Sequence, residues 1–343
     1  MKYGAVVQYY LDKPYAPDFW SLLQRAGCTY LEGAVRREVA DEAANRGMKV
    51  ALSYSGIVSN PNNATGSFSS EAAMVNSLVG RNISQYRNHA GVYGHILSIE
   101  PCNNYDFDPR NPDASTLKLI RVLKAGVTYI KQQDPTHPAW IGLNAAGAYG
   151  EGSDYLDRRR AWIRLFIDWC DVLDWHLYRW EIGGKVFTSD LDMLDQRTDE
   201  MLAMLKQESK GKPVIIGEIG VPTGTFPIYG NPSVTVTEQD QLTYFLHVAP
   251  KIVKYGFTPF IFKLMDDEPY QGFEPYFGIF RKHSAAKPLV DWLPSLFSGN
   301  TQPDPQPGPV IEAPAPEPIE PQDSKALFVL MLTAALAALK GEK

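Results

Sequence analysis

Short apolar runs recur along residues 1 to about 298, and longer stretches with helical periodicity separate them. Glycines follow several of the helical stretches, as expected at helix ends; examples are Gly27, Gly47, Gly211 and Gly256. The apolar runs predict eight strands, over Tyr3–Gln8, Cys28–Leu31, Lys49–Ser53, Tyr93–Ile99, Ala139–Leu143, Val172–Leu177, Val214–Gly217 and Thr258–Lys263.

Eight strand–helix units in this length of chain are typical of an α/β protein with a (β/α)₈ (TIM) barrel, which we predict over residues 1–298. An open doubly wound sheet is the alternative. That fold needs a glycine-rich phosphate turn after its first strand, and residues 7–17, "VQYYLDKPYAP", contain no glycine. The pattern therefore favours the barrel.

The composition changes near residue 299. Residues 303–321 contain eight prolines, which predict an extended, semi-rigid linker over 299–323. Residues 324–343 then predict a short helix whose apolar part, 326–339, is 14 residues long. Such a helix spans about 21 Å, less than the roughly 30 Å core of a bilayer. Membrane association, docking or oligomerisation, and a targeting remnant all stay open, and apolarity on every face favours the first.

The overall composition is that of a globular protein, with 44% apolar and 21% charged residues. A formal net charge of −6 argues against general affinity for nucleic acid or anionic membranes. The three cysteines are widely spaced and predict free thiols in a reducing compartment. The N-terminus does not have the pattern of a signal peptide, so secretion would need another route or a leader that has been removed. The C-terminal tail is a candidate for association with a membrane or a particle. No zinc-like spacing is present, and we expect no metal or other cofactor.

Polar and aromatic residues follow the predicted strands, and in a barrel those strand ends form the rim where active sites lie. Glu100 ends the fourth strand and Glu218 ends the seventh. Two carboxylates on one rim are typical of glycosidic bond hydrolysis, in which one acts as acid and the other as nucleophile or base. The other candidates at strand ends are Tyr9, Tyr10, Asn144, His176, Tyr178, Trp180 and Lys263.

Three motifs carry a family resemblance: "SIEP" at Glu100, "HLY" at residues 176–178 and "IIGEIGVP" around Glu218. They resemble the clan of (β/α)₈ retaining glycoside hydrolases that includes the family 5 cellulases and mannanases. The resemblance covers residues 1 to about 298. It implies Glu100 as the acid/base and Glu218 as the nucleophile, 118 positions apart (218 − 100). A β-linked oligo- or polysaccharide is the implied substrate.

The same resemblance places His176 and Tyr178 near the nucleophile. Trp180 and the Tyr9/Tyr10 pair are candidates for stacking on sugar rings. Two positions depart from the clan's pattern. Ile99 stands where most members have an Asn that contacts the sugar 2-hydroxyl, and Lys263 stands where an aromatic residue is common. Lys263 is a candidate for binding an acidic sugar by charge pairing.

Other functions also fit the sequence. A barrel that binds carbohydrate without cutting it, or a structural barrel displayed on a linker, is the main alternative, and Ile99 favours it. Transglycosylation would use the same two carboxylates as hydrolysis. The acidic run of Asp266, Asp267 and Glu268 is expected in a solvated loop rather than in a metal site.

Overall fold

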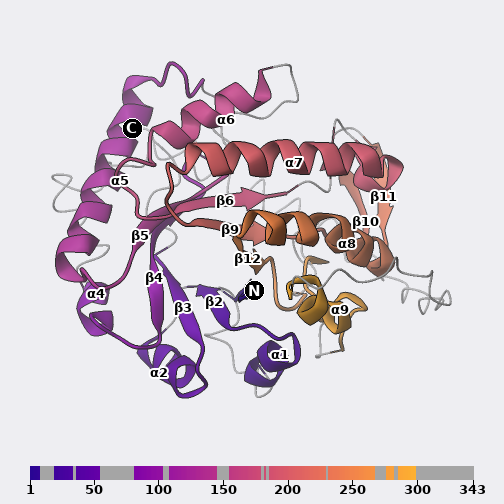
Figure 1. Cartoon of the computed structure of the whole chain (residues 1–343), viewed down its shortest axis with the longest axis horizontal. Coiled ribbons are helices and arrows are strands. Elements are labelled where there is room, and N and C mark those ends of the chain that lie inside the picture. Colours follow the sequence, from indigo (N-terminus) through magenta and orange to yellow (C-terminus); the bar gives the residue numbers. More distant parts are fainter. Residues whose placement is uncertain are drawn as a thin grey trace, which may run out of the picture. The chain divides into compact units, whose positions relative to one another are not determined.

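The computed structural model confirms the predicted fold class. Eight parallel strands pair in the order β1-β12-β9-β6-β5-β4-β3-β2 and close into a barrel (Figure 1). Each lies on or beside one of the eight apolar runs of the sequence. The barrel strands are β1 (Gly4–Val6), β2 (Tyr30–Gly33), β3 (Lys49–Ser53), β4 (Val92–Ile99), β5 (Ala139–Leu143), β6 (Leu173–Leu177), β9 (Val214–Ile219) and β12 (Thr258–Ile261).

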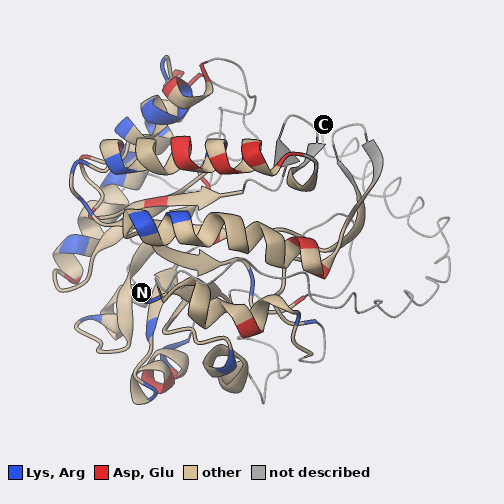
Figure 2. Ribbon diagram, turned by 45° about the vertical axis from the view of Figure 1, so that its right-hand side comes forward, with Lys and Arg blue, Asp and Glu red and all other residues tan. Residues whose placement is uncertain are grey.

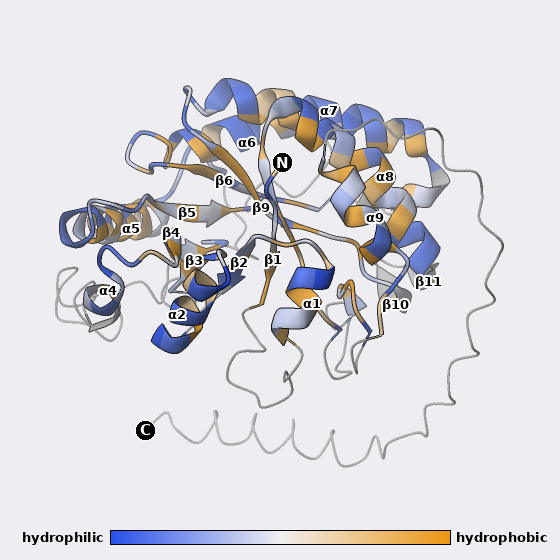
Figure 3. Ribbon diagram, turned by 60° about the horizontal axis from the view of Figure 1, so that its bottom comes forward, coloured by the Kyte–Doolittle hydropathy of each residue, from blue (hydrophilic) through white to orange (hydrophobic). Residues whose placement is uncertain are grey.

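Helices cover the outside of the barrel, with apolar faces packed on the strands and hydrophilic faces outward (Figure 3). They are α1 (Phe19–Arg25), α2 (Arg37–Asn45), α4 (Arg81–Tyr86), α5 (Ala114–Gln133), α6 (Tyr155–Arg164), the 3₁₀ turn η3 (Phe187–Ser189), α7 (Leu191–Glu208), α8 (Glu238–Tyr255) and α9 (Leu289–Leu296). Two antiparallel ribbons are added, β7 (Glu181–Ile182) with β8 (Lys185–Val186), and β10 (Gly224–Ile228) with β11 (Asn231–Val236).

The structure describes residues 1–7, 19–33, 36–54, 81–102, 108–144, 154–178, 181–182, 185–228, 231–266, 276–281 and 285–298. The predicted linker over 299–323 and the predicted helix over 324–343 lie outside these residues, as do Tyr9, Tyr10 and Trp180.

Local sequence signals fix the ends of the long helices. Thr237 and Asp240 form a reciprocal capping box at the start of α8, and Gly256 ends that helix in the left-handed conformation with φ 72°. At the start of α5, the Asp113 side chain accepts a hydrogen bond from the Thr116 backbone N–H. Each such cap contributes about 1 kcal/mol.

The lower part of the barrel interior is an aromatic layer. Tyr30 packs against Tyr93 and Phe260, with ring centroids 4.8 and 6.0 Å apart, and Tyr93 meets Trp140 edge-on at 6.1 Å. Trp140 also donates a hydrogen bond from Nε1 to Asp174 Oδ2 at 2.8 Å. This hydrogen bond links the aromatic layer, near the amino-terminal ends of the strands, to a layer of polar side chains nearer their carboxyl ends, which includes Asp174.

Charged residues lie mainly on the outer helices, and α7 carries several acidic ones (Figure 2). Cys28, Cys102 and Cys170 are buried free thiols, as the sequence predicts. Among the helices that the structure describes, none has the length and apolarity needed to cross a membrane.

Candidate active site

Glu218 occupies the penultimate position of β9, at the carboxyl end of the strand. Its partner in the β-ladder is His176 of β6. Because ladder partners point to the same face of a sheet, the two side chains meet inside the barrel. His176 Nδ1 lies 3.2 Å from Glu218 Oε2, and the Glu218 side chain is only 6% exposed. The register of β6 on β9 therefore fixes where this carboxylate stands.

Glu100 directly follows β4 and has a left-handed backbone, with φ 48°. A non-glycine residue in that region stores of the order of 1 kcal/mol or more of strain, and such residues concentrate at functional sites. The Glu100 backbone N–H donates to Gly142 O at 2.8 Å, which anchors the turn on β5. Its carboxylate Oε1 lies 2.7 Å from His176 Nδ1, and the side chain is 19% exposed. Glu100 is therefore the more accessible of the two acids.

The spacing between the two acids is short. A carboxylate oxygen of Glu100, a carboxylate oxygen of Glu218 and a ring nitrogen of His176 all lie within 4.8 Å of one another. Inverting glycosidases hold their carboxyls about 6.5–9.5 Å apart to admit a water, whereas retaining enzymes hold them about 5–5.5 Å apart. The limit of 4.8 Å applies to the nearest oxygen of each carboxylate, and a pair this close is compatible with the retaining arrangement. The same three donors also meet the distance requirement for a metal ion.

Tyr178, just beyond β6, donates its hydroxyl hydrogen bond to Glu218 Oε2. Its ring packs edge-on against Phe262 and Phe277, with centroids 5.9 and 5.6 Å away. These contacts hold the phenol rigidly. The Glu218 carboxylate is thus oriented by Tyr178 and His176 together.

The histidine between the acids is set up to carry a positive charge. Its side chain is fully buried, and burial alone would lower its pKa. The charge of Glu218 and the hydrogen bonds to Glu100 and Glu218 outweigh that effect and raise the pKa of His176 well above its usual range. A protonated His176 offsets part of the negative charge of the two carboxylates.

Two glycines, Gly142 and Gly217, have no side chain where His176 and Asp174 pack against the backbone. A Cβ on Gly142 would lie 3.1 Å from His176 Nε2, and a Cβ on Gly217 would lie 2.1 Å from Asp174 Oδ1. The second distance is far below any van der Waals contact. Larger residues at these positions would displace Asp174 or His176 from beneath the two acids.

Two buried acids, Glu32 and Asp174, lie in the same layer and were not among the predicted site residues. Burial raises the pKa of Asp174 to about 6, with a further increase from Glu218 and opposition from His176 and the Trp140 hydrogen bond. Burial and the charges of Asp174 and Glu218 raise the pKa of Glu32 well above its usual range. Neither carboxyl oxygen of Glu32 has a hydrogen-bond partner among the described residues. The pKa shift of Glu32 therefore favours the protonated carboxyl in the folded protein.

This shift makes Glu32 a source of pH-dependent instability, because the folded protein holds the proton of that carboxyl to a higher pH than the unfolded chain does. Stability relative to Glu32→Gln should therefore fall as pH rises. We expect the free energy of unfolding of Glu32→Gln to gain on that of wild type as the pH rises from 5 to 7. Urea denaturation at both pH values measures the gain. The exposed Glu38→Gln is the control, and an equal difference at both pH values for Glu32→Gln would contradict the assignment.

The structure also describes three other residues that the sequence analysis singled out. Asn144 follows β5 and is buried. Lys263, two residues beyond β12, is 1% exposed, with its ammonium 5.8 Å from the Phe262 ring centroid. The expectation of a solvated Asp266 is wrong, because its side chain is 12% exposed and pairs with Lys287 at 2.9 Å.

Comparison with known proteins supports the fold. No family model matches the chain, and no curated protein matches it. Among solved structures, the β-glucuronidase of Faecalibacterium prausnitzii is similar, with 15% identity and a TM-score of 0.58 over 81% of this chain and 44% of that one. A β-D-glucuronidase of Dictyoglomus thermophilum is 15% identical, with a TM-score of 0.57 over 82% of this chain and 46% of that one.

A third similar structure is a glycoside hydrolase family 17 β-1,3-glucanosyltransferase from Rhizomucor miehei. It is 15% identical, with a TM-score of 0.57, and the match covers 87% of this chain and 98% of that one. The chain thus spans less than half the length of the glucuronidases that it resembles. At these identities the likeness establishes a shared barrel fold, and membership of family 5 stays a prediction.

Proposed function

We propose that the protein is a retaining glycoside hydrolase, with Glu218 as the nucleophile and Glu100 as the acid/base. The observation that carries the proposal is that one oxygen of Glu100, at the end of β4, and one oxygen of Glu218, in β9, lie within 4.8 Å of each other on the rim of a barrel. The proposal also agrees with the names of the similar structures, two β-glucuronidases and a glucanosyltransferase.

In the first step, Glu218 Oε attacks the anomeric carbon while Glu100 donates its proton to the glycosidic oxygen. The bond between the anomeric carbon and that oxygen breaks, and a glycosyl ester on Glu218 forms. Tyr178 and His176 contact Glu218 Oε2. They keep the carboxylate oriented for the attack and share its charge before the bond forms.

In the second step, Glu100 acts as a base, takes a proton from water and directs the oxygen to the anomeric carbon. The ester bond to Glu218 breaks, and the sugar leaves with its original configuration. The position of Glu100 suits both steps, since it is more exposed than Glu218 and shares His176 with it. If a sugar hydroxyl replaces water, the same residues perform transglycosylation.

The substrate we propose is a β-linked glycan, and β-glucuronides belong in the first panel tested. Lys263 places a cation at the carboxyl end of β12, and an acidic sugar would bind it by charge pairing. Because this side chain is 1% exposed, the sugar carboxylate would have to reach into the barrel mouth. Asn144, buried at the end of β5, is a candidate for a hydroxyl contact.

The alternative that a specific observation favours is a barrel that binds carbohydrate without cutting it. Ile99 precedes Glu100, where an Asn side chain would contact the sugar 2-hydroxyl. A site without that contact loses interactions that strengthen in the transition state. Glycan binding with no turnover across the panel would favour this alternative.

A trapping experiment tests the proposal directly. Incubation with 2-deoxy-2-fluoro β-glycosides that carry a good leaving group should inactivate the protein and add one sugar to it, because the fluorine slows release of the covalent intermediate. Mapping by peptide mass spectrometry should place the label on Glu218. A label on any other residue would overturn the nucleophile assignment. Turnover without trapping, and with inverted product, would overturn the retaining mechanism.

A further inference from the structure

A second cluster of possible metal ligands lies far from the candidate active site. His95 is in the first half of β4, five residues before Glu100 (100 − 95), or about 16 Å along the strand. Asp134 directly follows α5, and His137 lies in the short connection from α5 to β5. This cluster is therefore near the amino-terminal ends of the strands, the face opposite the catalytic rim.

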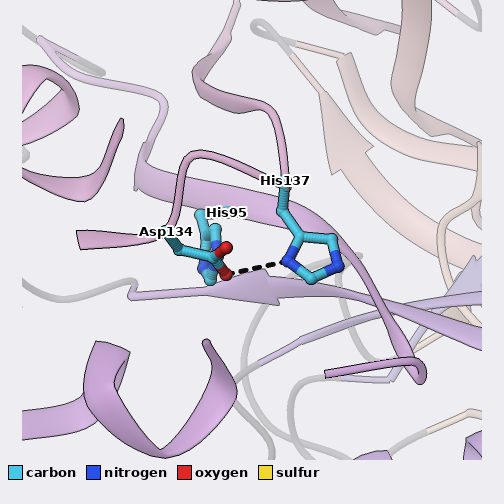
Figure 4. Close-up of side chains that lie close together, drawn as sticks. All are labelled: His95, Asp134 and His137. Carbon is cyan, nitrogen blue, oxygen red and sulfur yellow. Dashed lines mark hydrogen bonds and ion pairs between the residues drawn. The ribbon is translucent and has the colours of Figure 1, made fainter. Parts of the chain in front are cut away.

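The three side chains converge on one point (Figure 4). His95 Nε2 lies 3.1 Å from Asp134 Oδ2, and His137 Nδ1 lies 2.7 Å from the same oxygen. One donor atom from each residue lies within 4.8 Å of the other two. Two imidazoles thus share one carboxylate oxygen.

Two of the three residues also have a hydrogen-bond partner on the atom that faces away from the cluster. The other ring nitrogen of His95, Nδ1, is 2.9 Å from the hydroxyl of Tyr54. The other oxygen of Asp134, Oδ1, accepts a hydrogen bond from Thr136 Oγ1 at 2.6 Å. Metal-binding histidines and carboxylates in proteins usually have such partners on the atom that does not bind the metal.

His137 is the most exposed member of the cluster. The side chains of His95 and Asp134 are 0% exposed, whereas that of His137 is 13% exposed. A cation would enter past His137, and a water on that side would supply a fourth ligand. Two neutral imidazoles and one carboxylate are donors that suit Zn²⁺ and its transition-metal neighbours rather than Mg²⁺ or Ca²⁺.

We propose that His95, Asp134 and His137 bind one Zn²⁺-like ion that fastens the α5–β5 connection to β4. A tetrahedral zinc with bonds of about 2.0–2.2 Å separates its ligand atoms by about 3.4 Å. The distance from Asp134 Oδ2 to His95 Nε2, now 3.1 Å, would open by about 0.3 Å, and that to His137 Nδ1, now 2.7 Å, by about 0.7 Å. Each neutral imidazole presents its lone pair by moving its proton to its other nitrogen. Tyr54 then accepts the hydrogen bond from His95 Nδ1.

Zinc titration of the full chain tests the proposal, after treatment with a chelator and dialysis. Isothermal titration calorimetry with ZnCl₂ on wild type should show binding that His137→Ala weakens by 100-fold or more. Tyr54→Phe, which removes only the outer contact, should weaken the same binding by about 10–100-fold. His247→Ala is the matched control, because His247 pairs with Asp195 on the outer helices. That variant should bind zinc like wild type.

A second readout separates metal binding from a hydrogen-bonded cluster. Zn²⁺ should raise the Tm of wild type and of His247→Ala and leave that of His137→Ala unchanged, since only a ligand that binds the folded state stabilises it. Co²⁺ should give wild type the visible absorption of a tetrahedral site, and His137→Ala should lack it. If zinc binds wild type and His137→Ala equally, or does not bind wild type, the cluster is a hydrogen-bonded network and the proposal fails. If His137→Ala does not fold, the comparison of Tyr54→Phe with wild type decides.

Discussion

Replacing Glu218 by Gln is expected to lower kcat for an activated aryl β-glycoside by more than about 10⁴-fold. An amide cannot form the glycosyl ester, and it cannot hold the negative charge that faces the anomeric carbon. The folded structure should persist, because the side chain keeps its size and its amide oxygen still accepts the Tyr178 hydrogen bond. Release of the aryl alcohol at saturating substrate measures kcat, and circular dichroism checks the fold.

A second variant, Glu218→Gly, provides a stereochemical test of the same assignment with azide. In Glu218→Gly, azide can enter the space left by the carboxylate and attack from the same side, so a β-glycoside should yield an α-glycosyl azide. Glu42→Gln is the matched control, because Glu42 is an exposed acid of α2 that pairs with Arg46, and its kcat should equal that of wild type. Normal turnover by Glu218→Gln would show that another group is the nucleophile.

The barrel could be predicted because each of its strands appears in the sequence as a short apolar run. The residues on either side of each run are more polar or have helical periodicity. Lys49–Ser53 and Ala139–Leu143 have the same bounds in the sequence reading and in the structure. Buried parallel strands require apolar residues on both faces, so their signal depends little on distant contacts. The linker and the apolar helix beyond residue 298 were inferred from composition alone, and they stay predictions.

The candidate site was predictable only in part. Glu100 and Glu218 stand out as carboxylates that end apolar strands, and the barrel brings strand ends together whatever the loops do. That one histidine contacts both acids depends on the register of β6 on β9, which a single sequence does not reveal. One signal for Asp174 was present, since Asp174, His176 and Tyr178 alternate along one face of β6 and its extension.

The burial of Glu32 and the cluster around Asp134 had no comparable signal. Glu32 is 1% exposed and faces the acids of other strands, although a glutamate that ends a strand usually reaches solvent. His95 and His137 are 42 positions apart (137 − 95) and do not follow a zinc-like spacing. They meet only because the α5–β5 connection returns beside β4, where Pro138 O accepts the His95 backbone N–H at 2.9 Å. Tertiary structure creates both features.

Replacing Glu100 by Ala should produce a loss that depends on the leaving group. For glycosides of alkyl alcohols or sugars, bond cleavage needs the proton that Glu100 donates, so kcat/KM should fall by about 10²–10⁴-fold. A dinitrophenolate leaves without that proton, and kcat/KM for its glycoside should remain near the wild-type value. Water would then lack its general base, so kcat should fall, KM should fall with it, and a burst of dinitrophenolate equal to the enzyme concentration should appear.

The outcome with azide separates the role of Glu100 from that of Glu218. Azide needs no base, so it should restore turnover of the dinitrophenyl glycoside by Glu100→Ala and yield a β-glycosyl azide, the opposite anomer to that expected from Glu218→Gly. Glu100 is 19% exposed and Glu218 is 6% exposed, which fits a small anion reaching the face that Glu100 leaves open. An equal loss for all leaving groups, or an α-azide from Glu100→Ala, would contradict the acid/base assignment. An α-azide would mean that the two carboxylates have exchanged roles, and an equal loss for all leaving groups would mean that Glu100 does not donate the proton.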